Sequence, residues 1–201
     1  MVLLAKEQVE VKLTPQEIVE KTTIADVYRA VKNLDGVIYK TKLIYSDYFS
    51  NLSHNDIYIK PENLQKTGSF KLRGAYNCIS QLSEEQKAHG VIAASAGNHA
   101  QGVAYAAQQL GVKAVIVMPA TTPLLKVEAT RAYGAEVVLS GDSFDDAAAK
   151  AVELQQEFNY TFIHPFNDIE VILGQGTTAL EIIDDLKDVD AILVPIGGGG
   201  F

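Results

Sequence analysis

Lys71 is the residue whose surroundings most favour chemistry. It follows a turn at Lys66-Thr67-Gly68 and lies in Ser69-Phe70-Lys71-Leu72-Arg73-Gly74-Ala75, near the start of a predicted helix that Ser69 can cap. The neighbouring Phe70 and Leu72 are apolar, and an amine that loses part of its solvation has a lowered pKa and becomes a better nucleophile. This setting suits a lysine that forms a Schiff base, although most lysines simply face solvent.

Two later segments carry groups that can bind anions. In Ser95-Ala96-Gly97-Asn98-His99, the side chains of Ser95 and Asn98 and the N–H groups at a helix start can bind a carboxylate. Asn98 could instead be only the helix N-cap, and a lone His99 is usually structural. The second segment consists of Gly197, Gly198, Gly199 and Gly200. Without Cβ atoms, their N–H groups can converge on a phosphate, whereas the alternative is a flexible linker.

A lysine, an asparagine-bearing loop and a glycine phosphate cradle are the parts needed to hold pyridoxal phosphate. The glycine run is not a P-loop, because no Gly-Lys-Ser/Thr follows it, and it lacks the glycine spacing of dinucleotide sites. The remaining histidines show no metal-ligand spacing, so we predict no metal site.

Apolar runs alternate with helical patterns from residue 90 onward. We predict strands at Val91–Ala94, Ala114–Met118, Glu136–Leu139, Tyr160–Ile163 and Ala191–Val194. We predict helices over residues 99–110, 123–133 (capped by Thr122), 144–158 and 169–186. This alternation indicates an α/β fold with parallel sheets covered by helices. Ligands of such sheets bind at the carboxyl ends of strands, where both the Ser95–His99 loop and the glycine run fall.

The first 55 residues are typical of helices and loops, with Thr14, Pro15 and Glu17 forming a helix start, and a strand follows at 56–60. The formal charge of −8 argues against non-specific nucleic-acid binding. We see no membrane-spanning run and no secretory signal. The single cysteine, Cys78, favours a buried apolar role in a reducing compartment, so we expect a cytoplasmic location.

The segment 62–75 resembles the cofactor-lysine segment of threonine dehydratases (threonine ammonia-lyases). Ala94-Ser95-Ala96-Gly97-Asn98-His99-Ala100-Gln101-Gly102 resembles their substrate loop. His164-Pro165-Phe166, then Gly174-Gln175-Gly176-Thr177, then the four glycines complete the pattern in order. The resemblance implies the two-domain fold-type-II architecture, similar to the tryptophan synthase β chain. Residues 90–167 would form a small mobile domain, and 1–89 with 168–201 would form part of a large cofactor-binding domain.

The resemblance also implies roles for individual residues. Lys71 would bind pyridoxal phosphate covalently and remove the α-proton, and Phe70 would pack against the pyridine ring. Asn98 would bind the ring hydroxyl, the glycine run would hold the phosphate, and Ser95 with the rest of its loop to His99 would bind the substrate carboxylate. The implied reaction converts L-threonine to 2-oxobutanoate and ammonia, and L-serine to pyruvate, toward isoleucine or in threonine catabolism. The family is usually dimeric or tetrameric, so a homo-oligomer is expected.

Several alternatives stay open. Serine racemases carry a second serine, which acts as a base, where this chain has Ala96, so we predict elimination without appreciable racemisation. Hydroxyaspartate ammonia-lyase and β-replacement synthases share the fold. An alternative outside the enzymes is a non-catalytic ligand-binding α/β domain, in which Lys71 would be a surface residue. Because the family's catalytic unit is longer than this chain, we expect the fold to be incomplete at its carboxyl end and the chain alone to have little activity.

Overall fold

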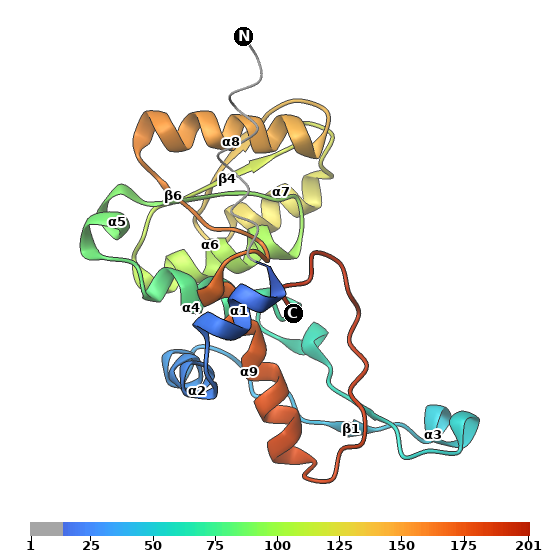
Figure 1. The fold of residues 1–201 in the computed structure, drawn as a ribbon. Helices are drawn as coiled ribbons and strands as arrows, with labels where there is room; N and C mark the ends of the chain where they lie inside the picture. Colours follow the sequence, from blue (N-terminus) through green and yellow to red (C-terminus); the bar gives the residue numbers. More distant parts are fainter. Residues whose placement is uncertain (1–13) are drawn as a thin grey trace.

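The computed structural model describes residues 14–201 and contains two sheets and several layers of helices (Figure 1). Up to residue 89 the elements are α1 (Pro15–Lys21), α2 (Ile24–Asn33), β1 (Ile44–Tyr45), α3 (Asp47–Ser53), β2 (Tyr58–Ile59), the 3-10 turn η1 (Glu62–Leu64), α4 (Lys71–Ser80) and α5 (Glu84–His89). The following elements are β3 (Val91–Ala94), α6 (Asn98–Leu110), β4 (Ala114–Met118), α7 (Leu124–Arg131), β5 (Glu136–Leu139), α8 (Phe144–Phe158), β6 (Thr161–Phe162) and α9 (Ile169–Asp185).

The larger sheet has four parallel strands in the order β5-β4-β3-β6. Helix α8 packs on one face, while α6 and α7 cover the other (Figure 1). Strands β3 and β4 are buried along their whole length, which explains why their sequences are apolar without alternation. Helix α4 packs against α6 on one side and α9 on the other, so it lies a layer further from the sheet. The predicted α/β fold with a helix-covered parallel sheet is therefore confirmed.

Many local predictions agree with the structure. Strands β3, β4 and β5 have the predicted bounds, and α8 covers the predicted residues. Thr14 and Glu17 form the capping box that starts α1. Helix α6 ends at Gly111, whose φ of +67° is the left-handed conformation that favours glycine at this position. Cys78 is buried in the core, as predicted.

The predicted strand at Ala191–Val194 is wrong. This run pairs with none of the strands described in residues 14–201, and Leu193 is 91% exposed. An apolar run becomes a strand only where a neighbouring strand exchanges backbone hydrogen bonds with it, and none of the described strands does so here.

Two predicted helix caps are also wrong. Pro123 takes the N-cap position of α7 instead of Thr122, because its φ and ψ are already extended and the helix starts directly after it. Phe70 takes the N-cap position of α4, and Ser69 instead accepts a long hydrogen bond of 3.4 Å from the N–H of Lys71.

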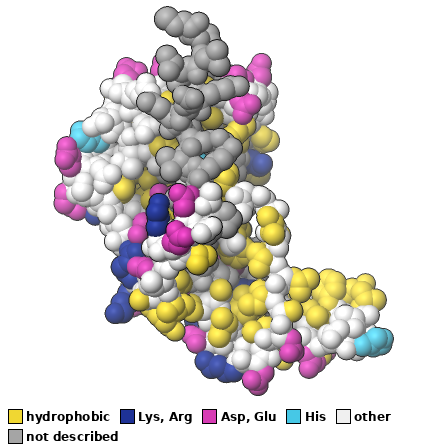
Figure 2. Space-filling model, viewed as in Figure 1, with side chains coloured by type: hydrophobic (Ala, Val, Ile, Leu, Met, Phe, Trp, Pro, Cys, Tyr) yellow, Lys and Arg dark blue, Asp and Glu magenta, His cyan; other side chains and the backbone are white. Residues whose placement is uncertain are grey.

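Strands β1 and β2 form an antiparallel pair, and α3 extends from it as an arm at the edge of the molecule (Figure 1). Figure 2 shows apolar side chains gathered over this arm. They include Tyr45, Tyr48, Phe49, Leu52 and Tyr58. Within residues 14–201, no helix has the length and apolar character required to cross a bilayer.

Candidate functional site

Lys71 is the first residue of α4 and is half-buried. Burial removes water from its amine and lowers the pKa of Lys71 below the ordinary value. Nζ donates a 2.6 Å hydrogen bond to the carbonyl of Pro165 and lies 5.3 Å from the centre of the Phe70 ring. Among residues 14–201 no carboxylate forms an ion pair with this amine, so no fixed negative charge stabilises its protonated form. The amine therefore has the features of a nucleophile or base.

The segment 163–167, between β6 and α9, links the other predicted site residues. His164-Pro165-Phe166 belongs to the pattern that resembles threonine dehydratases, and here the Pro165 carbonyl accepts the bond from Lys71. The side chain of Phe166 lies against Gly198, and its carbonyl lies against Gly200. A Cβ at position 200 would lie 2.5 Å from that carbonyl oxygen, so only glycine fits there. The segment therefore contacts both the lysine and the glycine run.

The glycine run, Gly197–Gly200, contacts this site through Phe166. Gly199 has a φ of +83°, and Gly197, Gly198 and Gly199 expose their backbone to solvent. Directly after the run, Phe201 stacks on Phe70 with 4.1 Å between the ring centres. The structure thus brings Lys71 and the four glycines together from positions more than a hundred residues apart in sequence. It also shows that the face of Phe70 contacts another aromatic ring.

The Ser95–His99 loop occupies the turn between β3 and α6. Gly97 takes the N-cap position and Asn98 starts the helix, so the alternative of Asn98 as the N-cap is wrong. The Asn98 side chain is exposed and hydrogen-bonds to nothing in residues 14–201. The hydroxyl of Ser95 accepts a bond of 3.3 Å from the Gly97 N–H, while Ala96 packs partly against the core. The Asn98 side chain is therefore available to a ligand, and the Ser95 hydroxyl can still donate its proton.

His99 points into the core rather than toward solvent. Its Nε2 lies 2.9 Å from the carbonyl of Ile163, and its Nδ1 is buried without a partner in the described chain. Burial, together with the nearby charge of Lys71, lowers the pKa of His99 to about 4. A carbonyl only accepts hydrogen bonds, so Nε2 carries the proton and the ring is neutral at pH 7. His99 thereby ties the segment after β6 to the start of α6.

Arg73 fixes α4 on the side facing η1 and α9. Its guanidinium is fully buried and donates at 2.7–3.0 Å to the carboxylates of Glu62 and Glu181. Lys60 adds a second cation at 2.5 Å from Glu181. Burial alone would raise the pKa of Glu62, but the hydrogen bonds and charge of Arg73 outweigh it and the pKa is lowered. The sequence analysis did not predict this network. The signal for it was Arg73, a charged residue that follows Leu72 and precedes Gly74 and Ala75.

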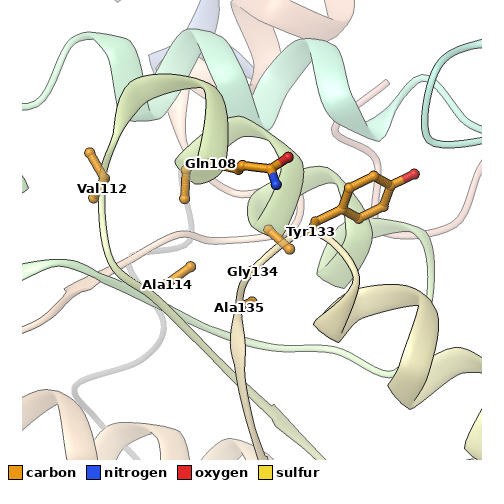
Figure 3. Close-up of a pocket in the computed structure, with 8 residues that line it drawn as sticks. Gln108, Val112, Ala114, Tyr133, Gly134 and Ala135 are labelled. Atoms are coloured by element: carbon orange, nitrogen blue, oxygen red, sulfur yellow. The ribbon is translucent and has the colours of Figure 1, made fainter.

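A cavity of about 90 Å³ beside α6 is separate from the residues around Lys71 (Figure 3). Its lining comes from Ala104, Ala107, Gln108, Val112, Ala114, Tyr133, Gly134 and Ala135. It contains none of the predicted site residues, and we assign it no role. Across residues 14–201, no cluster of three or more His, Cys, Asp or Glu side chains could hold a metal ion.

The groups around Lys71 fit pyridoxal phosphate. The cofactor needs an amine without a carboxylate partner for its aldehyde, which Lys71 provides. It needs backbone N–H groups for its phosphate, and those of Gly197–Gly199 lie in an exposed run near that amine. It also needs a polar side chain for its ring oxygen, and Asn98 has no competing partner in the described residues.

Known proteins similar to this chain are consistent with this chemistry. An L-threonine ammonia-lyase of Thermotoga maritima is 54% identical over 89% of this chain and 45% of its own length. The processed form of threonine deaminase isoform 2 from Solanum lycopersicum superposes with a TM-score of 0.84, at 44% identity, over 94% of this chain and 51% of that one. A maize serine racemase superposes with a TM-score of 0.86, at 36% identity, over 89% of this chain and 54% of that one.

The chain thus spans about half the length of these relatives. The sequence model of one family, described as "Pyridoxal-phosphate dependent enzyme", matches residues 34–201. That match includes Lys71, the Ser95–His99 loop and the glycine run. The chain therefore belongs to the pyridoxal-phosphate dependent enzyme family.

Proposed function

We propose that the protein deaminates L-threonine to 2-oxobutanoate and ammonia, and L-serine to pyruvate, with pyridoxal phosphate bound to Lys71. The observation that carries this proposal is the Lys71 amine, which is half-buried, has a lowered pKa and bonds to Pro165, next to the Phe166 that contacts the glycine run. Relatives named threonine ammonia-lyase and threonine deaminase support the choice of substrate. Because the chain spans about half of these relatives, the activity is proposed for the whole protein.

Bound pyridoxal phosphate supplies an electron sink for the substrate α-carbon. The chain itself supplies the base, which is Nζ of Lys71. Its lowered pKa increases the fraction of unprotonated amine near neutral pH, so it can accept the α-proton. The Pro165 carbonyl accepts a hydrogen bond from this amine and holds it in place between proton transfers.

The other residues bind and orient. We assign the substrate carboxylate to the N–H groups at the start of α6, with Ser95, Ala96, Gly97, Asn98 and His99 forming the loop. Within this loop His99 acts through the Ile163 carbonyl, because its ring is buried. Asn98 also binds the cofactor ring oxygen, Phe70 packs beside the ring, and the glycine run holds the phosphate.

We further propose that residues 90–167 move as a small domain against a large domain formed by 1–89 and 168–201. The four-stranded sheet and the helices that cover it lie entirely within 90–167, which supports this boundary. Closure would bring the Ser95–His99 loop against Lys71 and exclude water. A homo-oligomeric state and a cytoplasmic location stay predictions.

Serine racemase is the second candidate, because a maize serine racemase has a closely similar structure. Racemisation needs an acid on the face of the α-carbon opposite Lys71. Ala96 has no titratable group, which favours elimination. D-serine formed as fast as pyruvate would establish the racemase instead.

The proposal is tested by adding pyridoxal phosphate to the purified whole protein and recording its visible absorption. We expect a band that borohydride bleaches and that peptide mapping assigns to Lys71. Lys71→Ala should lose both the band and 2-oxo acid formation. Lys66→Ala is the matched control, because this half-buried lysine lies over the rings of Tyr39 and Tyr105, and it should keep both. If wild type gives no band, the non-catalytic ligand-binding domain becomes the better interpretation.

A further inference from the structure

Helix α4, which starts with Lys71, is in close contact with the helices on both of its sides. Toward α9, a Cβ on Gly74 would lie 2.6 Å from the Val171 carbonyl, and a Cβ on Gly174 would lie 2.6 Å from the Cα of Gly74. Real Cβ atoms do not approach other atoms this closely, so the backbones of α4 and α9 touch through glycine. Helix α4 therefore has no room to move toward α9.

Toward α6, the contact falls on the peptide group of Lys71 itself. A Cβ on Gly102 would lie 3.1 Å from the carbonyl carbon of Lys71, 3.2 Å from its oxygen and 3.1 Å from the nitrogen of Leu72. These distances are tight rather than impossible, so a methyl group would separate the two helices by a few tenths of an ångström. The atoms in contact are backbone, which cannot rotate away.

Gly102 also lies one helical turn after Asn98. Residues four apart in a helix share a face, so Asn98 lies on the same face of α6 as Gly102, which contacts the start of α4. Glycine within a helix is less favourable than alanine, so its presence here needs a reason, and close packing supplies one.

We propose that Gly102 is a positioning residue, which sets the separation between Lys71 and the Ser95–Asn98 loop through direct backbone contact. This inference rests on the proposed function. A side chain at 102 would push α4 and α6 apart. Because α9 blocks α4, the displacement falls on α6, which carries Asn98. The base and the substrate-binding loop then move apart.

The test compares Gly102→Ala with wild type in the purified whole protein loaded with pyridoxal phosphate. The matched control is Gly176→Ala in α9, where the new Cβ would lie 3.7 Å from Val27 in ordinary contact. Visible absorption, thermal unfolding, kcat and KM for L-threonine are measured for all three proteins. A misplacement of about 1 Å can cost about a hundredfold in rate, so a few tenths of an ångström predicts a loss of about fivefold to tenfold in kcat.

We expect Gly102→Ala to keep its fold and its Lys71 band, with the lower kcat and a KM within about twofold of wild type. Gly176→Ala should retain wild-type kinetics. The proposal is overturned if kcat of Gly102→Ala stays within about twofold of wild type, or if Gly176→Ala loses as much. It is also overturned if Gly102→Ala fails to fold or loses its band, because Gly102 would then be a packing residue only. A wild-type protein without the band would instead disprove the proposed function.

Discussion

Acidification should destabilise this protein through His99 before it affects the carboxylates. The ring is buried and neutral, its Nε2 proton is donated to Ile163, and its Nδ1 has no partner in the described chain. A second proton would have to be placed on that buried Nδ1, which explains why the pKa falls to about 4. In the unfolded chain the same ring takes up a proton near its ordinary value.

The sign and size of the effect follow from this difference. The folded pKa of His99 is lowered from 6.5 to about 4, so the unfolded state binds more protons between these values and stability falls as the pH falls. Between about pH 7 and about pH 4.5 the loss amounts to about 2.5 kcal/mol in the free energy of unfolding. The lowered pKa of Glu62 acts in the same direction, but only below its ordinary value of 4.5.

Urea unfolding of wild type and His99→Gln at about pH 7 and about pH 4.5 measures this loss in the free energy of unfolding. The glutamine amide can still donate to Ile163 but does not titrate, so the variant should lack about 2.5 kcal/mol of the pH dependence. His89→Gln, at the end of α5, is the control and should behave as wild type. If wild type and His99→Gln lose the same stability on acidification, His99 is not a buried neutral side chain and the reasoning is refuted.

Three further predictions concern stability and reactivity. Arg73→Met should lower the free energy of unfolding by about 3–5 kcal/mol in urea, because the buried Glu62 would lose the guanidinium that binds it and Glu181 would keep only Lys60, and Arg73→Lys should lower it less. Ser143→Ala should cost about 1 kcal/mol, since it removes the side-chain cap of α8, and a larger loss would contradict a simple capping role. Cys78 should resist a maleimide reagent in the folded protein and react after denaturation, because burial raises the pKa of its thiol well above the ordinary value.

Elements whose signals are local could be predicted from the sequence. Strands β3 and β4 are apolar at every position because both faces of the sheet are covered, and this pattern needs no knowledge of their partners. Helix α8 begins at Phe144 because Ser143 and Asp146 form a capping box within four residues. Lys71 and Asn98 each stand at the start of such an element, α4 and α6, whereas the glycine run follows the predicted strand at Ala191–Val194, which the structure does not form.

Features that depend on two distant segments could not be predicted in this way. The run Ala191–Val194 is as apolar as β3, but a strand also requires a neighbour, and the described chain provides none. Likewise, nothing near Pro165 in the sequence indicates that its carbonyl faces Lys71.

The properties of Lys71 depend both on local sequence and on contacts with distant segments. Its position at the start of α4 follows from local sequence, but the state of its amine depends on burial and on the Pro165 carbonyl, which belong to the tertiary fold. His99 hydrogen-bonds to the segment that provides this carbonyl. Gly102 sets the distance between α6 and the Lys71 peptide group. Neither residue needs to touch a substrate to affect proton transfer. Substitutions at these two positions should therefore change the rate more than substrate binding, whereas a substitution at Asn98 should weaken binding as well.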